Sequence, residues 1–216
     1  MAIDGIIFDL DGTLWDSCRV VAESWTQIMR KSYGEARIFT ADDIKSIMGL
    51  TAPDIAKKLF SGYGDKALEI CRGCMDEELV YLYEHSGDVY PGVEEMLSRL
   101  SKRWPLFIVS NCQDGYIQCF FGATGFDKYI KDIECEGVTG LGKADNIKLL
   151  CQRNGLAAPV YVGDTAGDER SAKAAGCCFI HAAYGFGTVQ APDAVLNSVA
   201  ELPAVLELME EENKNV

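Results

Sequence analysis

Basic side chains are scarce in this sequence of 216 residues: 20 Lys and Arg stand against 33 Asp and Glu, a formal net charge of −13. An acidic surface repels nucleic acid and anionic membranes unless its few cations are clustered, and the sequence shows no basic cluster. We therefore expect neither nucleic acid nor a membrane among its partners. An anionic substrate would need a local positive group, such as a metal ion, to hold it.

Histidine is also scarce, and long apolar runs and an export signal are lacking. The first residues carry no basic segment ahead of an apolar run, and stretches such as residues 106–109 are far shorter than a membrane span. The nine cysteines are an odd number, which argues against a disulfide framework. Cys71 and Cys74 have the spacing of a metal site, but the two histidines offer no second pair of zinc ligands. We expect a reduced, cytoplasmic protein.

Short apolar runs alternate with helical patterns through most of the chain. The runs that we predict as buried strands are residues 3–10, 105–110, 159–163 and 177–182. Apolar residues at helical spacing mark residues 94–100, 143–154 and 166–175. This alternation predicts an α/β fold with a parallel sheet covered by helices on both faces.

Residues 16–88 break the alternation. They carry helical patterns and no convincing strand, with Thr40 as a candidate N-cap and Pro53 suited to a first helical turn. We expect the helices at residues 17–33, 42–48, 55–60 and 66–84. An all-helical insertion after the first strand predicts a cap domain over residues 16–88, with a core of residues 1–15 and 89–216.

Two carboxylates follow the first predicted strand, in Asp9-Leu-Asp11-Gly-Thr-Leu14. Alternation would place Asp9 and Asp11 on one side if the extended geometry continued. Such close carboxylates repel each other unless a cation lies between them or one is protonated. The pair suits a nucleophile beside a general acid/base with a divalent metal, and Gly12 would turn the chain and offer backbone N–H groups to an anion.

Polar residues also follow the other predicted strands. Ser110 and Asn111 end the second run and can bind phosphoryl oxygens, although Ser-Asn is also ordinary loop chemistry. Asp164 and Asp168 flank a Gly-containing turn, where Asp168 could equally cap the next helix. Lys143 opens a helix between these acidic strand ends. Ligands of parallel sheets bind beyond the carboxyl ends of the strands, so we expect these side chains to meet.

In this order, the four sites resemble the four motifs of the haloacid dehalogenase superfamily, whose core is Rossmann-like. Asp9 to Leu14 is similar to the first motif, Ser110-Asn111 to the second, Lys143 to the third, and Gly163-Asp164 with Asp168 to the fourth. The helical insertion is similar to the family's C1-type cap. Tyr90-Pro91-Gly92-Val93 resembles members close to phosphoglycolate phosphatase.

The resemblance implies a Mg²⁺-dependent phosphatase that acts on a small phosphorylated metabolite. Asp9 would attack phosphorus, and Asp11 would protonate the leaving oxygen and then activate water. Asp9, the backbone carbonyl of Asp11 and Asp164 would hold Mg²⁺. Lys143 would offset negative charge and, with Gly12, Ser110 and Asn111, bind phosphate, while Asp168 would orient Lys143 or a metal-bound water.

Several alternatives stay open. A β-phosphoglucomutase-like phosphomutase could use the same residues, and a receiver-like signalling module would also place acidic groups and a lysine at strand ends. An inactive binding protein is disfavoured because no expected catalytic position is missing. Phosphonate hydrolysis would use a cap lysine, and neither Lys57 nor Lys58 can be assigned that role. The third motif also departs from the Lys-Pro-x-Pro of many relatives, because it reads Lys143-Ala-Asp-Asn146.

The cap is expected to close over the site, exclude water and set specificity. The candidate specificity residues are Trp15, Arg19, Gly49 and Thr51. For Trp15 and Gly49, ordinary packing and an ordinary turn are equally good interpretations. The oligomeric state is expected to be a monomer or a homodimer.

Overall fold

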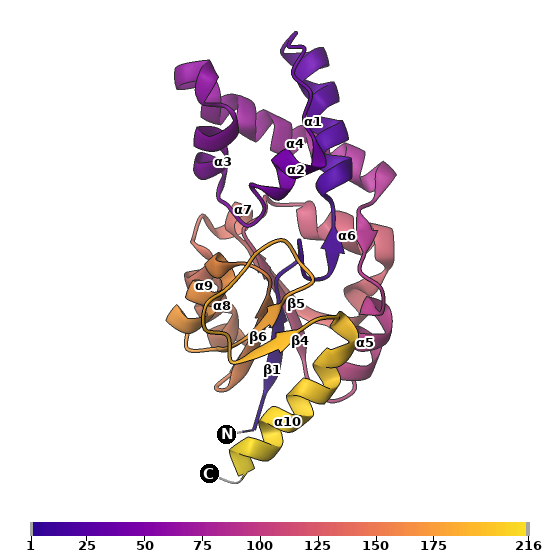
Figure 1. Ribbon diagram of the computed structural model, residues 1–216, viewed down its shortest axis with the longest axis vertical. Coiled ribbons are helices and arrows are strands. Elements are labelled where there is room, and N and C mark those ends of the chain that lie inside the picture. Colours follow the sequence, from indigo (N-terminus) through magenta and orange to yellow (C-terminus); the bar gives the residue numbers. More distant parts are fainter. Residues whose placement is uncertain (1, 215–216) are drawn as a thin grey trace.

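Six parallel strands form the central sheet of the computed structural model, which describes residues 2–214 (Figure 1). The strand order is β5-β4-β1-β6-β7-β8, with β1 Gly5–Phe8, β4 Leu106–Ser110, β5 Ile130–Cys135, β6 Pro159–Gly163, β7 Cys178–Ala182 and β8 Ala194–Leu196. Strand β1 lies between β4 and β6, where Ile6 pairs with Leu106 on one side and Val160 on the other. The carboxyl ends of these three strands therefore meet at one edge.

Both faces of the sheet are buried because alternate strand residues face opposite layers. Ile7, Phe107 and Tyr161 pack on one face with residues of α8 Lys143–Asn154 and α9 Ala166–Ala174. Ile6 and Leu106 belong to the opposite core, which α5 Val93–Leu100, α6 Tyr116–Thr124 and α10 Leu202–Lys214 cover. Each fully buried side chain of this size contributes about 1.5–3 kcal/mol. The α/β fold with helices on both faces is confirmed.

A group of helices stands above the carboxyl edge of the sheet (Figure 1). Its elements are α1 Cys18–Ser32, α2 Ala41–Lys45, α3 Ala52–Leu59, η1 Ser61–Lys66 and α4 Ala67–His85. Thr40 caps α2 in a capping box with Asp43, and Pro53 lies in the first turn of α3, as predicted. Trp25 packs against Phe39 and Phe60 with ring centroids 5.5 and 5.6 Å apart, and this aromatic group is continuous with the hydrophobic core on the Ile6 face of the sheet.

Two short strands join this helical group to the sheet layer. β2 Trp15–Asp16 pairs antiparallel with β3 Asp88–Val89, placing Trp15 opposite Val89 and Asp16 opposite Asp88. The chain therefore leaves and re-enters the sheet layer at one place. The remaining short elements are η2 Phe126–Tyr129, α7 Glu136–Thr139 and η3 Val199–Glu201.

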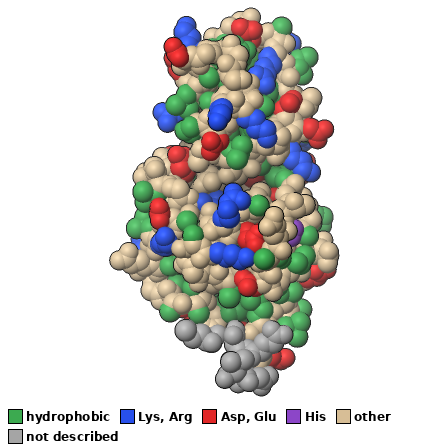
Figure 2. Space-filling model, turned by 60° about the vertical axis from the view of Figure 1, so that its left-hand side comes forward, with side chains coloured by type: hydrophobic (Ala, Val, Ile, Leu, Met, Phe, Trp, Pro, Cys, Tyr) green, Lys and Arg blue, Asp and Glu red, His purple; other side chains and the backbone are tan. Residues whose placement is uncertain are grey.

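One face of the molecule carries side chains of both charges. On the face drawn in Figure 2, Lys and Arg side chains are interspersed with Asp and Glu over both the helical group and the sheet layer.

Within residues 2–214, the helices include none with both the length and the apolar character required to cross a membrane. Cys71 and Cys74 are buried in α4, where burial raises the pKa of both thiols to about 12. They are core side chains rather than an exposed metal or redox pair.

Candidate active site

Asp9 and Asp11 lie just past the end of β1, at the centre of the carboxyl edge. The strand ends at Phe8, although the Asp9 amide still donates to the Val162 carbonyl over 2.8 Å. The chain then turns, with Leu14 N–H donating to the Leu10 carbonyl oxygen at 2.8 Å, so the extended geometry does not continue to Asp11. Both carboxylates nevertheless line one cavity of about 60 Å³ between the sheet and the helical group.

Lys143 joins two buried carboxylates. Its Nζ lies 2.8 Å from Asp9 Oδ1 and 2.5 Å from Asp168 Oδ1, and all three side chains are almost fully buried. Burial alone would lower the pKa of the Lys143 ammonium, but Asp168 and Asp9 raise it well above its ordinary value. Lys143 is therefore a fixed positive charge beside Asp9.

Asp168 both caps a helix and holds Lys143, so the two interpretations of this residue are compatible. Its Oδ2 accepts hydrogen bonds from the Thr165 amide at 2.9 Å and from Thr165 Oγ1 at 2.6 Å, in a capping box at the start of α9. Its Oδ1 accepts from Lys143. Burial would raise the pKa of Asp168, but Lys143 and these hydrogen bonds hold it below its ordinary value. Both oxygens are thus engaged by protein groups.

Asp164, after β6, keeps one oxygen without a partner. Oδ2 accepts from the Phe186 amide at 2.7 Å, whereas Oδ1 is buried and finds no hydrogen-bond donor among the described residues. Burial and the charge of Asp168 raise the pKa of Asp164 to about 7. Carboxylate oxygens of Asp9, Asp164 and Asp168 lie within 4.8 Å of one another. Because buried polar atoms are normally paired, the free oxygen of Asp164 suits a hard cation.

Asp11 has hydrogen-bond partners that the sequence does not indicate. Its Oδ1 accepts from Ser17 Oγ at 2.7 Å and from Tyr116 OH at 2.8 Å. Burial raises the pKa of Asp11 to about 6, and these two hydrogen bonds limit the rise. A carboxyl group with such a pKa can both give and take a proton near neutral pH. Ser17 and Tyr116 were missed because their contact with Asp11 arises only in the fold.

The structure does not support the prediction that Gly12 offers backbone N–H groups to an anion. Its backbone N–H donates to the Trp15 carbonyl oxygen at 2.9 Å, and the Thr13 N–H donates to the Leu10 carbonyl oxygen at 3.2 Å, so neither is free to bind phosphate. Gly12 instead meets a steric requirement. It has φ +79°, and a Cβ there would lie 2.3 Å from Asp164 Oδ2.

Ser110 and Asn111 line the same cavity as Asp9 and Asp11. Ser110 is buried at the end of β4. Asn111 Nδ2 donates to the Gly49 carbonyl oxygen at 2.9 Å, which connects the sheet layer to the helical group, and its buried Oδ1 finds no partner in the described part of the chain. Six predicted side chains therefore gather around Asp9 at one edge of the sheet: Asp11, Ser110, Asn111, Lys143, Asp164 and Asp168.

A family model matches residues 6–182, and its description is haloacid dehalogenase-like hydrolase. The chain belongs to this family. The hydrolase is 30% identical to a phosphoglycolate phosphatase of Chromobacterium violaceum over 93% of this chain and 95% of the relative. It is 27% identical to a phosphoglycolate phosphatase of Escherichia coli over 98% of this chain and 96% of the relative.

Solved structures share the fold of this hydrolase. A haloacid dehalogenase-like hydrolase from Streptococcus pneumoniae superposes with a TM-score of 0.77 at 25% identity, covering 94% of this chain and 98% of the other. A predicted phosphoglycolate phosphatase from Haemophilus somnus gives 0.78 at 21% identity, covering 94% and 97%. The superfamily resemblance and the prediction of a phosphatase-type enzyme are confirmed, and the family favours an enzyme over a receiver-like module.

Only some of the predicted cap residues reach the cavity of the hydrolase. Gly49 lines it, but Thr51 hydrogen-bonds Asp54 at 2.9 Å and lines a neighbouring groove. Trp15 is fully buried and packs against Tyr116 with ring centroids 5.8 Å apart. It belongs to the core.

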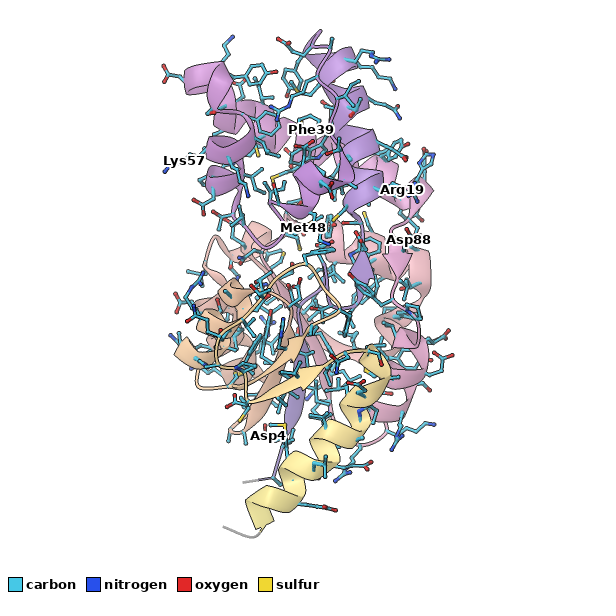
Figure 3. All side chains as sticks on the ribbon, in the orientation of Figure 1. Asp4, Arg19, Phe39, Met48, Lys57 and Asp88 are labelled. Carbon is cyan, nitrogen blue, oxygen red and sulfur yellow. The ribbon has the colours of Figure 1, made fainter. Side chains whose placement is uncertain are left out.

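Arg19 and Lys57 also lie away from the cavity. Arg19 is exposed, and its guanidinium nitrogen lies 3.9 Å from a carboxylate oxygen of Asp88 in β3; both residues are labelled on the outer side of the molecule in Figure 3. Lys57 is on the outer side of the helical group in the same view, while Lys58 donates to the Ser46 carbonyl oxygen at 2.5 Å. Neither lysine is placed for a Schiff base in the cavity.

Proposed function

We propose that this hydrolase is a Mg²⁺-dependent phosphatase that releases phosphate from a small phosphorylated metabolite through a phosphoaspartate on Asp9. The arrangement of Asp9 carries the proposal. Asp9 is buried against Lys143, lies in a group of carboxylate oxygens with Asp164, and lines a cavity together with Asp11. These are a nucleophile, a charge partner, a free acidic oxygen and an acid/base group in one place.

In the proposed first step, an Asp9 carboxylate oxygen forms a bond to phosphorus while the bond to the leaving oxygen breaks. Asp11 donates a proton to that oxygen. In the second step, Asp11 takes a proton from water, the water oxygen bonds to phosphorus, and the bond to Asp9 breaks. Ser17 and Tyr116 orient Asp11 by donating to its Oδ1. Ser110 and Asn111 would bind the phosphoryl oxygens.

A divalent cation fits the charges of this site. Asp9, Asp164 and Asp168 bring three carboxylates against the single ammonium of Lys143, which leaves two negative charges uncompensated. Asp168 already uses both oxygens, so we propose that Asp9, the backbone carbonyl of Asp11 and Asp164 hold Mg²⁺. All are oxygen donors, which Mg²⁺ prefers. The ion would neutralise charge between the phosphate and the carboxylates.

We propose that residues 16–88 act as a cap over a core of residues 1–15 and 89–216. The paired strands β2 and β3 are the two crossings between these parts. The cavity of about 60 Å³ has room for only a few water molecules, so substrate entry requires the cap to move. Phosphoglycolate, specified by the names of curated relatives, and sugar phosphates are candidate substrates.

The proposal is tested by Mg²⁺-dependent hydrolysis of p-nitrophenyl phosphate. Asp9→Asn should reduce kcat by at least about 10³-fold, since no nucleophile remains, and Asp11→Asn should also be severely impaired. Asp145→Asn, an exposed aspartate on α8, is the control for the loss of one charge and should keep wild-type activity. Near-wild-type turnover by a folded Asp9→Asn variant would refute the nucleophile assignment. A phosphomutase would instead return the phosphoryl group to a sugar phosphate.

A further inference from the structure

Glu78 is a buried carboxyl group for which the proposed chemistry has no use. It lies on α4, in the cap, and only 3% of its surface is exposed. It lines the same cavity as Asp9 and Asp11, on the side away from the sheet. Burial raises the pKa of Glu78 to about 8, and the charge of Asp11 adds to the rise. Burying a carboxyl group costs free energy unless partners compensate it, so the partners and surroundings of Glu78 indicate its role.

Two donor contacts, one from each part of the protein, hold the Glu78 carboxyl group in place. Trp25 Nε1, in the cap, donates to Oε2. Gln113 Nε2, in the loop after β4, donates to Oε1 at 2.6 Å and also to the Met75 carbonyl oxygen at 2.8 Å. A carboxylate can accept about four hydrogen bonds, and Trp25 and Gln113 supply two. Glu78 therefore keeps acceptor positions for a group inside the cavity.

No cationic side chain of the described residues lines the cavity beside Glu78. The titratable carboxyl groups of the cavity are Asp9, Asp11 and Glu78, and none of the described residues that line it is Lys, Arg or His. Lys143 bonds to Asp9 and Asp168 and is not part of this lining. The remaining cap walls are apolar, as at Val21, Ile47 and Met75. On the cap side of the cavity, an organic group would therefore meet hydrocarbon and one carboxyl group, that of Glu78.

We propose that Glu78 determines substrate specificity by accepting a hydrogen bond from the organic part of the phosphate ester. The preferred organic part is short and carries a donor, an ammonium above all and a hydroxyl next. A carboxylate on the organic part is disfavoured when Glu78 is ionised, because two negative charges would then be buried side by side with no cation among the described lining residues. The inference rests on the proposed phosphatase activity and separates this chain from relatives whose names specify phosphoglycolate.

Three two-carbon phosphate esters test the inference, because they differ mainly in the charge of the organic part. They are O-phosphoethanolamine, 2-hydroxyethyl phosphate and phosphoglycolate, each assayed for kcat/KM with Mg²⁺ at about pH 9, where Glu78, with a pKa of about 8, is mostly ionised. We expect this order of decreasing kcat/KM, with at least about tenfold between the first and the last. This ranking needs no variant. A preference for phosphoglycolate overturns the inference and leaves the phosphatase activity standing.

Glu78→Gln tests the role of the residue itself. We expect the ratio of kcat/KM for O-phosphoethanolamine to that for phosphoglycolate to fall by about tenfold or more, mainly through KM. Glu77→Gln is the matched control, since Glu77 is the exposed neighbour that accepts from Ser32, and its ratio should not change. An unchanged ratio in folded Glu78→Gln refutes the role of Glu78. If wild type hydrolyses none of the three esters nor p-nitrophenyl phosphate, the proposed function fails and the inference falls with it.

Discussion

At the scale of single residues, burial acts on each carboxyl group according to the partners that the group finds. Asp168 has Lys143 and Thr165, and its pKa lies below the ordinary value. Asp164 accepts one hydrogen bond, from the Phe186 amide, and its other oxygen has no donor among the described residues; its pKa is raised to about 7. The sequence predicts which residues are chemically suited to the site, because strand ends and residue types are local. It cannot predict Tyr116 as a partner of Asp11, because 105 positions separate them.

Replacing Lys143 by methionine tests its role as the compensating charge. Asp9 and Asp168 would lose their common cation, so we expect kcat to fall by at least about 100-fold and the free energy of unfolding by about 3–5 kcal/mol. Urea denaturation and p-nitrophenyl phosphate turnover measure the two effects. Lys148→Met, an exposed lysine of the same helix that pairs with Asp145, should change neither. If Lys143→Met behaves like Lys148→Met, the ion-pair account is wrong.

The pKa of Glu78 predicts how stability changes with pH. Because the folded-state pKa is about 8 against an ordinary 4.5, the folded protein binds more protons between these values. The free energy of unfolding therefore falls as pH rises from about 4.5 to about 8, by on the order of 5 kcal/mol at most. Glu78→Gln should lose this part of the pH dependence.

Urea denaturation of wild type and Glu78→Gln at about pH 5 and about pH 9 isolates the contribution of Glu78 from that of other titrating groups. Exposed Glu77 supplies the control substitution, Glu77→Gln. Parallel pH dependence in wild type and Glu78→Gln would contradict a raised pKa.

At the scale of elements, the central strands were predictable and the edge strands were not. β1, β4 and β6 are fully buried apolar runs, and such runs stand out in a sequence. β5 has Lys131, Asp132 and Glu134 among its six residues, and β8 has only three residues. Both lie at the edges of the sheet, where half-exposed strands carry polar residues. The helices α6 and α10 were also missed.

The turn after β1 makes a sharp prediction at Gly12. Alanine there would adopt a left-handed φ and place its Cβ 2.3 Å from Asp164 Oδ2, so we expect loss of activity and lower stability. Gly34→Ala is the control, because Gly34 also has a positive φ but nothing lies within 4 Å of the added Cβ. Both variants should lose about 1 kcal/mol from backbone strain, measured by thermal unfolding, and only Gly12→Ala should lose turnover. Equal activity in the two variants would show that Asp164 tolerates displacement.

At the scale of the whole molecule, the helical group and the sheet layer share one hydrophobic cluster, and polar contacts join them beside the cavity. Asn111 Nδ2 reaches the Gly49 carbonyl oxygen, and Gln113 Nε2 reaches Glu78. Figure 3 shows Met48 at the base of the helical group, facing the sheet layer. The helices α1 to α4 were predictable from the spacing of their apolar residues. The polar contacts between the helical group and the sheet layer were not, because each joins residues far apart in the sequence.

The central claim is that Asp9 becomes covalently phosphorylated during turnover. The most direct measurement is borohydride trapping during hydrolysis with Mg²⁺, followed by mass spectrometry of the peptide that contains Asp9, since borohydride reduces an acyl phosphate to an alcohol. The account predicts homoserine at position 9 that requires both substrate and Mg²⁺ and is absent from Asp9→Asn. Active turnover without this product, or with the reduced residue at another aspartate, would contradict it.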